Sequence, residues 1–354
     1  MGALIPPRDD ASLGEGYHSP QVPVAVRLNT NESPFPPPPG FTEALASAVA
    51  AIPFHRYPDR DATALRTGLA ELEGVRPDQV FCANGSNEVL QPLLLTYGGP
   101  GRAAAVFEPT YALHSHIARI TATTVATGGR AADFSLDLDD VKRVVNDSAA
   151  EITFVCSPNN PTGGAESRAT IEHVLQLAPG LLVVDEAYGQ FAPWSAIELV
   201  DDDVPLVVIR TFSKTWSMAA ARLGYLVGPA PIVASLQQRA LPYHLDAMKQ
   251  VAGTLALGYR TEMQARVASV VEERGRLFAG LATLPVRVWP SDANFILFQP
   301  ERTTATAVWH ALVERSILVR DCSSWSHLDN CLRVTVGTPD ENTAFLDALW
   351  EILR

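Results

Sequence analysis

The chain has 354 residues, 47% of them hydrophobic and 19% charged, which is ample for a large buried core. The 39 acidic residues outnumber the 27 basic ones, and the formal net charge of −12 argues against general binding to nucleic acids or anionic membranes. No apolar run approaches the roughly 20 residues that a membrane-spanning helix needs. The first ten residues, MGALIPPRDD, lack the apolar region of a signal peptide. We therefore expect a soluble, cytoplasmic protein.

The cysteines and histidines give no sign of a metal site. The four cysteines (Cys82, Cys156, Cys322 and Cys331) lack CxxC spacing, so neither a zinc site nor a disulfide framework is indicated, and we expect reduced, mostly buried thiols. His114 and His116 alternate without a third ligand at a recognisable spacing. We expect them on a helix surface or in the core, and we expect no bound metal.

The first 40 residues read as an irregular, proline-rich arm that needs a surface to pack on. Amphipathic, alanine-rich patterns at 41–51 and 62–72 predict two helices. Between them, residues 55–59 form a loop with Tyr57 near its tip.

From residue 79 onward, short apolar runs alternate with helical patterns. The predicted strands are 80–82, 103–107, 121–127, 152–156, 181–184, 204–209 and 225–227, and the helices between them are 88–95, 111–120, 138–145 and 167–177. This alternation is typical of a mostly parallel seven-stranded sheet with helices on both faces. Ligands of such sheets bind beyond the carboxyl ends of the strands.

After residue 231 the pattern changes to that of a smaller α+β unit. It begins with a long helical region, 246–280, interrupted near 258–259. Strands at 286–289, 295–298, 317–319 and 332–336 and helices at 304–315 and 341–353 follow. We predict an α/β protein with an arm (1–40), a large domain (41–259) and a small domain (260–354).

Lys214 stands in the segment 210–224, RTFSKTWSMAAARLG, directly after an apolar strand. An amine there can react with carbonyl groups once burial or a nearby cation lowers its pKa. The surrounding hydroxyl groups and Arg222 suit phosphate oxygens. The stretch alone equally fits a helix capped by Ser213 and followed by a solvated lysine.

Polar groups also follow the other strands. Ser86 and Asn87 open a helix whose first N–H groups suit a phosphate, although an ordinary helix capped by Ser86 fits as well. Tyr111 follows the second strand, where it would stack on a planar ligand or simply pack.

Two further strand ends carry amide and carboxylate groups. Asn160, within SPNNPTG (157–163), would donate to a ligand oxygen or stabilise a turn. Asp185 ends an apolar strand and requires a partner unless it lies in a surface turn, and Tyr188 follows it closely. Together these side chains, with Lys214, predict one site at the edge of the sheet.

These motifs resemble, in order and spacing, those of the fold-type I pyridoxal-phosphate aminotransferases, and the resemblance covers essentially the whole chain. It implies that Lys214 binds the cofactor covalently and moves the substrate proton, and that Asp185 holds the pyridine nitrogen protonated. It further implies that Asn160 and Tyr188 bond the ring oxygen and that Tyr111 stacks on the ring. The implied phosphate ligands are Ser86, Asn87, Thr211, Ser213, Arg222 and, from a neighbouring subunit, Tyr57, so the expected unit is a homodimer with shared sites.

Segments outside this core resemble the histidinol-phosphate aminotransferases within that family. They are 17–20 (YHSP), 27–34, 55–59, 241–245, 291–295 and 319–338. The resemblance implies transfer of an amino group from L-histidinol phosphate to 2-oxoglutarate, which yields imidazole-acetol phosphate and L-glutamate in histidine biosynthesis. The implied substrate residues are Tyr17, Asn31, Arg320 and Arg333; a surface ion pair is the alternative for the two arginines.

The core motifs leave other activities open. The same scaffold serves aminotransferases for phenylalanine or tyrosine, a threonine-phosphate decarboxylase, and a non-catalytic protein that binds the cofactor. Asp246 stands where the resemblance leads us to expect a small hydroxyl residue, which leaves that part of the substrate rim open.

Overall fold

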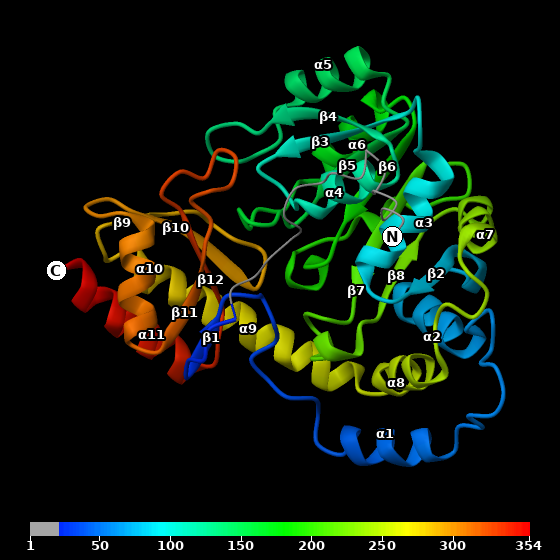
Figure 1. Cartoon of the computed structure of the whole chain (residues 1–354), viewed down its shortest axis with the longest axis horizontal. Coiled ribbons are helices and arrows are strands. Elements are labelled where there is room, and N and C mark those ends of the chain that lie inside the picture. Colours follow the sequence, from blue (N-terminus) through cyan, green and yellow to red (C-terminus); the bar gives the residue numbers. More distant parts are fainter. Residues whose placement is uncertain (1–20) are drawn as a thin grey trace, which may run out of the picture.

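The computed structural model describes residues 21–354 and builds them around two sheets (Figure 1). A seven-stranded sheet with its helices forms one part of the molecule, and a five-stranded sheet forms the other. Helix α9 (Arg260–Leu281) runs between the two parts (Figure 1). Within the described residues, no helix is long and apolar enough to cross a membrane.

The seven-stranded sheet has the order β2-β8-β7-β6-β5-β3-β4. Its strands are β2 (Val80–Ala83), β3 (Ala103–Glu108), β4 (Thr124–Gly129), β5 (Ile152–Cys156), β6 (Leu181–Asp185), β7 (Leu206–Thr211) and β8 (Gly224–Val227). Strand β8 runs antiparallel to both of its neighbours, and the other pairs are parallel. The predicted mostly parallel sheet is confirmed, and each strand lies within a few residues of the apolar run that predicted it.

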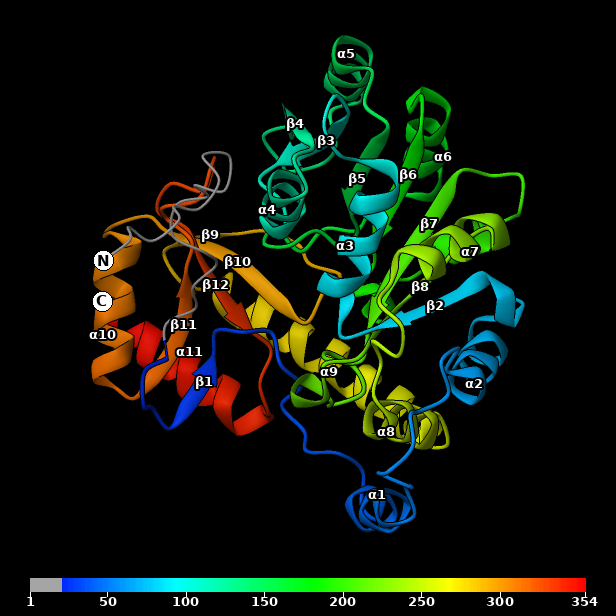
Figure 2. The ribbon, with the colours of Figure 1, turned by 45° about the vertical axis from the view of Figure 1, so that its right-hand side comes forward.

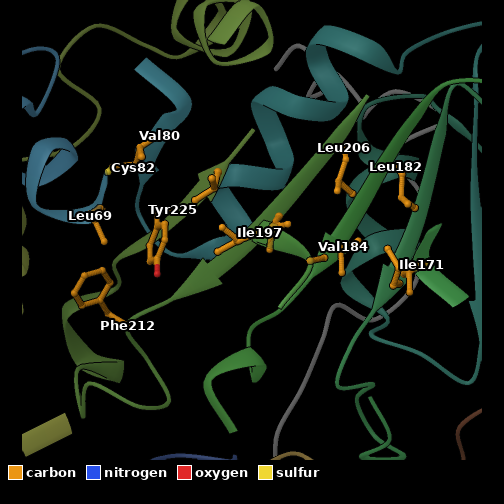
Figure 3. Packing of buried hydrophobic residues seen from close by; sticks show 14 of the residues in the cluster. Leu69, Val80, Cys82, Ile171, Leu182, Val184, Ile197, Leu206, Phe212 and Tyr225 are labelled. Carbon is orange, nitrogen blue, oxygen red and sulfur yellow. The ribbon is translucent and has the colours of Figure 1, made fainter. Parts of the chain in front are cut away.

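Helices cover both faces of this sheet (Figure 2). One face packs against α3 (Ser86–Tyr97), α4 (Leu113–Ile120) and α7 (Ala230–Arg239). The other packs against α2 (Thr63–Glu73), α5 (Leu138–Ser148), α6 (Arg168–Leu177) and α8 (Ala247–Leu257). Figure 3 shows this second core, which includes Leu69 and Ile171 from helices and Val80, Leu182 and Leu206 from strands. Burial of both faces explains why the strands read as continuous apolar runs.

The five-stranded sheet has the order β1-β11-β12-β10-β9. Its strands are β1 (Val26–Leu28), β9 (Val286–Val288), β10 (Phe295–Pro300), β11 (Ile317–Asp321) and β12 (Leu332–Thr335), and it packs on α9, α10 (Ala305–Glu314) and α11 (Pro339–Leu353). Strand β1 pairs in parallel with β11. The irregular arm predicted from the sequence therefore contains a strand, because the edge of β11 supplies the backbone partners that three residues cannot supply alone.

Several local predictions need correction. Helix α1 (Phe41–Ala50) and the break between α8 and α9 occur as predicted, whereas α7 was not predicted. Ser86 is not a helix cap: it is the first residue of α3, and Gly85 holds the cap position with φ +84°. Asp246 caps α8 by accepting from the Lys249 backbone N–H, a local structural role.

Candidate active site

A cavity of about 380 Å³ lies at the carboxyl ends of the strands, within the roughly 300–1,000 Å³ typical of small-molecule sites. Ten of the expected cofactor residues line it: Ser86, Asn87, Tyr111, Asn160, Asp185, Tyr188, Thr211, Ser213, Lys214 and Arg222. Two expected substrate residues, Asn31 and Arg333, line it as well. The fold therefore brings together side chains that lie far apart in the sequence.

Lys214 is the amine of this cavity. Its Nζ donates to the Thr30 carbonyl oxygen at 3.0 Å and lies 5.8 Å from the centre of the Tyr188 ring. Burial lowers the pKa of Lys214 to about 7, the cations of Arg333 and Arg222 act in the same direction, and Glu32 opposes them. A substantial fraction of the amine is therefore neutral near pH 7. The alternative of a solvated lysine after a cap at Ser213 is wrong, because no helix begins there.

Asp185, at the end of β6, is 1% exposed and has two hydrogen-bond partners. Its Oδ2 lies 2.9 Å from Nε2 of His114, and its Oδ1 accepts from the Ala187 backbone N–H at 3.0 Å. The His114 ring is fully buried and stacks on Phe154 with a centroid distance of 4.7 Å. The surface-turn alternative for Asp185 is wrong: the carboxylate is buried, paired and facing the cavity.

The sequence reasoning missed the role of His114. It predicted packing, which the buried ring does show, but not the contact with Asp185. A signal was present, because His114 follows Tyr111 by three residues and lies in the first turn of α4, at the same edge of the sheet. Only the packing of α4 on the sheet, beside β3 and β4, aims the ring at the carboxylate.

The start of α3 and the loop after β7 form a cradle of donors. The Thr211 hydroxyl donates to Ser213 Oγ at 3.0 Å, and Arg222 Nη1 donates to the same oxygen at 3.3 Å. A Cβ added at Gly85 would lie 2.9 Å from Arg222 Nη2, so the absence of a side chain there admits the guanidinium. The free N–H groups of the first turn of α3 complete a site that suits a phosphate group.

Arg333 is buried at 2% exposure on the opposite wall. Its Nη1 donates to Asn160 Oδ1 at 2.5 Å and its Nη2 to the Asn29 carbonyl at 2.9 Å, while its Nε lacks an acceptor within the described residues. A surface ion pair is therefore the wrong description of Arg333. Nearby, Asn31 Nδ2 donates to the Tyr188 hydroxyl at 3.0 Å, and burial raises the pKa of that hydroxyl.

Two expected site residues within the described chain, Arg320 and Tyr57, do not line the cavity. Arg320 is buried beside Arg333 in the β11–β12 register, with its guanidinium 5.3 Å from the Trp325 ring, and does not line the cavity. Tyr57 is 80% exposed and stacks on Tyr243 with a centroid distance of 4.6 Å. Tyr17 lies outside the described residues.

An α/β fold with a low-pKa lysine beside a phosphate cradle and a buried carboxylate defines an enzyme that works on carbonyl compounds and amines. In agreement with this, residues 23–349 match the family model described as aminotransferase class I and II. The chain belongs to that family.

Individual relatives match this chain over nearly its full length. The histidinol-phosphate aminotransferase of Mycobacterium marinum is 43% identical over 97% of this chain and 91% of its own. The histidinol-phosphate aminotransferase of Thermobifida fusca is 43% identical over 98% of this chain and 95% of its own length. The crystal structure of histidinol-phosphate aminotransferase from Sinorhizobium meliloti in complex with pyridoxal-5'-phosphate superposes with a TM-score of 0.85 over 94% of this chain and 91% of that chain. At 23% identity, this last likeness concerns the fold.

Proposed function

We propose that the protein uses pyridoxal phosphate to transfer the amino group of L-histidinol phosphate to 2-oxoglutarate, which gives imidazole-acetol phosphate and L-glutamate. The observation that carries this proposal is one cavity that joins the low-pKa Lys214 to a phosphate cradle on one wall and to the buried Arg333 on the other. The relatives that are 43% identical over nearly the whole chain support this choice of substrate.

The residues present fit the cofactor. The Gly85–Arg222 approach and the hydroxyls of Ser213 and Thr211 suit its phosphate, with Ser86 and Asn87 at the start of α3. Asp185, paired on one oxygen with His114, suits a protonated ring nitrogen. Asn160 and Tyr188 would bond the ring oxygen, and Tyr111 would contact the ring face. When bound, pyridoxal phosphate withdraws electrons from the substrate carbon that loses its proton.

Lys214 is the proposed general base. Its neutral amine would take the proton from the substrate carbon that carries the nitrogen and hold that proton for the return transfer. Arg333, whose Nε has no acceptor among the described residues, would bind the substrate phosphate. Asn31 would help to orient the substrate through its hydrogen bond to the Tyr188 hydroxyl. Arg320 and Tyr17 are proposed as further phosphate ligands, which requires Arg320 to turn from Trp325 toward Arg333.

The first test is an absorbance spectrum of the purified protein, followed by titration with L-histidinol phosphate and then with 2-oxoglutarate. We expect a band of protein-bound cofactor that is lost with the first compound and restored by the second. A band that responds to L-phenylalanine but ignores L-histidinol phosphate would keep the chemistry and replace the substrate. Absence of a band after adding pyridoxal phosphate would refute the enzyme proposal.

Two variants separate the remaining alternatives. Lys214→Ala should abolish turnover, whereas a protein that only binds the cofactor would have no turnover to lose. Arg320→Ala should lower kcat/KM for L-histidinol phosphate and leave that for L-phenylalanine unchanged. Equal losses of kcat/KM for the two donors would show that Arg320 does not bind the substrate phosphate. Release of carbon dioxide from threonine phosphate would favour a decarboxylase.

We further propose a cytoplasmic homodimer with an arm at 1–40, a large domain at 41–259 and a small domain at 260–354. Large apolar side chains exposed in the loop around Tyr57, before α8 and at its start support a dimer surface: Phe54, Tyr57, Leu241, Tyr243 and Met248. Sedimentation should give twice the 38.1 kDa of one chain. A monomer at micromolar concentration would contradict the proposal. The four cysteines, all free and buried, fit a reducing compartment.

A further inference from the structure

A second cavity, of about 320 Å³, lies between the two parts of the molecule and shares no lining residue with the active-site cavity. The seven-stranded part contributes Pro109 and the segment around Phe134. The five-stranded part contributes Arg287 and Trp289 at the edge strand β9 and Asp329 from the loop between β11 and β12. The volume falls in the range of small-molecule sites.

Two opposite charges line this second cavity without pairing. Arg287 and Asp329 are both exposed, and neither forms a salt bridge with any of residues 21–354. Both charges act on the Cys331 thiol: burial raises its pKa to about 12, Cys322 and Asp329 add to the increase, and Arg287 opposes it. A guanidinium and a carboxylate held apart in one cavity are complementary to a small zwitterion.

The apolar part of the second cavity is aromatic. The Phe134 and Trp289 rings meet with centroids 5.3 Å apart, and the Arg287 guanidinium lies 4.7 Å from the centre of the Trp289 ring. A guanidinium stacked in this way keeps its N–H edge available for a carboxylate. The Trp289 indole N–H is buried and has no acceptor among the described residues.

We propose that this second cavity binds a free amino acid with a planar side chain. Arg287 binds its carboxylate, Asp329 binds its ammonium group, and the planar side chain packs against Phe134 and Trp289. The second cavity is separate from the transamination site. The proposal therefore does not depend on which amino donor the enzyme uses.

An occupant of the second cavity would touch segments that lead to both walls of the active site. Pro109 precedes Tyr111 by two residues, and its carbonyl accepts from Asn159 Nδ2 at 2.9 Å. Cys331 precedes Arg333 by two residues. Because the ligand would bridge the two parts of the molecule in their folded arrangement, its binding should raise the melting temperature of the protein.

The test is isothermal titration calorimetry of the cofactor-loaded protein with L-histidine, L-phenylalanine and L-tryptophan, with L-leucine as the non-planar control. The cofactor absorbance is followed in parallel, because a ligand at Lys214 changes that band and a ligand in the second cavity does not. We expect at least one planar amino acid to bind without changing the band, and L-leucine to bind about tenfold or more weakly. If none of the four binds outside the active site, the proposal is refuted.

Matched ligands and variants then test which side chain binds which charged group of the amino acid. The amide of the amino acid that binds lacks the carboxylate, and its N-acetyl derivative lacks the ammonium group; each should bind wild type about tenfold or more weakly. In Arg287→Gln, the amide should bind as tightly as the parent amino acid, whereas the N-acetyl derivative should still bind more weakly. In Asp329→Asn, the N-acetyl derivative should bind as tightly as the parent amino acid, whereas the amide should still bind more weakly. Both side chains are exposed, so the variants should fold and keep wild-type turnover. Penalties that persist unchanged in both variants would overturn the assignment.

Discussion

At the scale of single residues, the environment of Lys214 predicts a pH dependence. Burial and the Arg333 and Arg222 cations lower its pKa from the ordinary 10.5 to about 7, so the amine is protonated below pH 7 and neutral above it. The rate at which pyridoxal phosphate attaches to cofactor-free protein should therefore rise about tenfold per pH unit below pH 7 and level off above it.

The Arg333→Gln variant tests the cause of this shift. Removing one cation near Lys214 raises the pKa of the amine, so the midpoint of the attachment rate should move to higher pH. Arg320→Gln is the control, because Arg320 is the cross-strand neighbour of Arg333 but is not among the charges that act on Lys214. An unmoved midpoint in Arg333→Gln would leave burial and the Arg222 cation as the causes of the lowered pKa.

His114 predicts a second effect at this scale. His114→Phe keeps a ring that can stack on Phe154 but removes the partner of Asp185 Oδ2, which leaves a buried carboxylate oxygen unsatisfied. We expect a loss of about 1–3 kcal/mol in unfolding free energy together with weaker cofactor binding. Thermal unfolding and cofactor titration measure the two losses.

The matched control is His116→Phe, two residues further along α4, where the histidine is only half-buried. It should leave both quantities near the wild-type values. If His114→Gln, whose amide nitrogen stands near the position of Nε2, were no better than His114→Phe, a specific role for the hydrogen bond to Asp185 would be excluded.

At the scale of elements, the junction between Gly85 and helix α3 controls the phosphate cradle. Gly85 has φ +84°, and a Cβ there would meet Arg222 Nη2 at 2.9 Å. Gly85→Ala should therefore cost about 1–2 kcal/mol in unfolding free energy, because of backbone strain, and should also displace Arg222 and weaken cofactor binding.

Gly101→Ala separates these two effects. Gly101 has a similar φ of +79°, but a Cβ there meets no atom within 4 Å. Both variants should lose stability, and only Gly85→Ala should lose affinity for pyridoxal phosphate in an absorbance titration. Equal affinities in the two variants would show that Arg222 does not depend on this contact.

At the scale of the whole molecule, the position of Tyr57 predicts active sites shared between subunits. Tyr57 is 80% exposed and does not line the cavity of its own chain, so we expect any role at the cofactor phosphate to be played in a partner. Tyr57→Ala alone should lower activity, and Lys214→Ala alone should abolish it.

Mixing the two variants provides the test. After subunit exchange, a mixed dimer contains one site with Lys214 from one chain and Tyr57 from the other, so its activity should exceed the sum of the two separate preparations. A mixture that gives only the sum would place Tyr57 outside the partner's site.

Much of the fold and of the candidate site is predictable because the relevant signals are local. Most of the seven strands follow from their apolar runs, since strands buried on both faces are mainly apolar; β4, at the edge of the sheet, is largely exposed. The polar groups that follow these strands have to meet at one edge, since parallel strands end on the same side of a sheet. These two regularities are enough to bring Asn160, Asp185 and Lys214 into one site.

What the sequence could not determine are the contacts between segments that are remote along the chain. Arg333 meets Asn160 across 173 positions, Lys214 meets Thr30 across 184, and His114 meets Asp185 across 71. Strand β1 likewise exists only because β11 offers it an edge. Periodicity and turn chemistry act within a few residues and can be read from the sequence. The direction of a buried side chain is decided by the packing of whole elements, and only the tertiary structure supplies it.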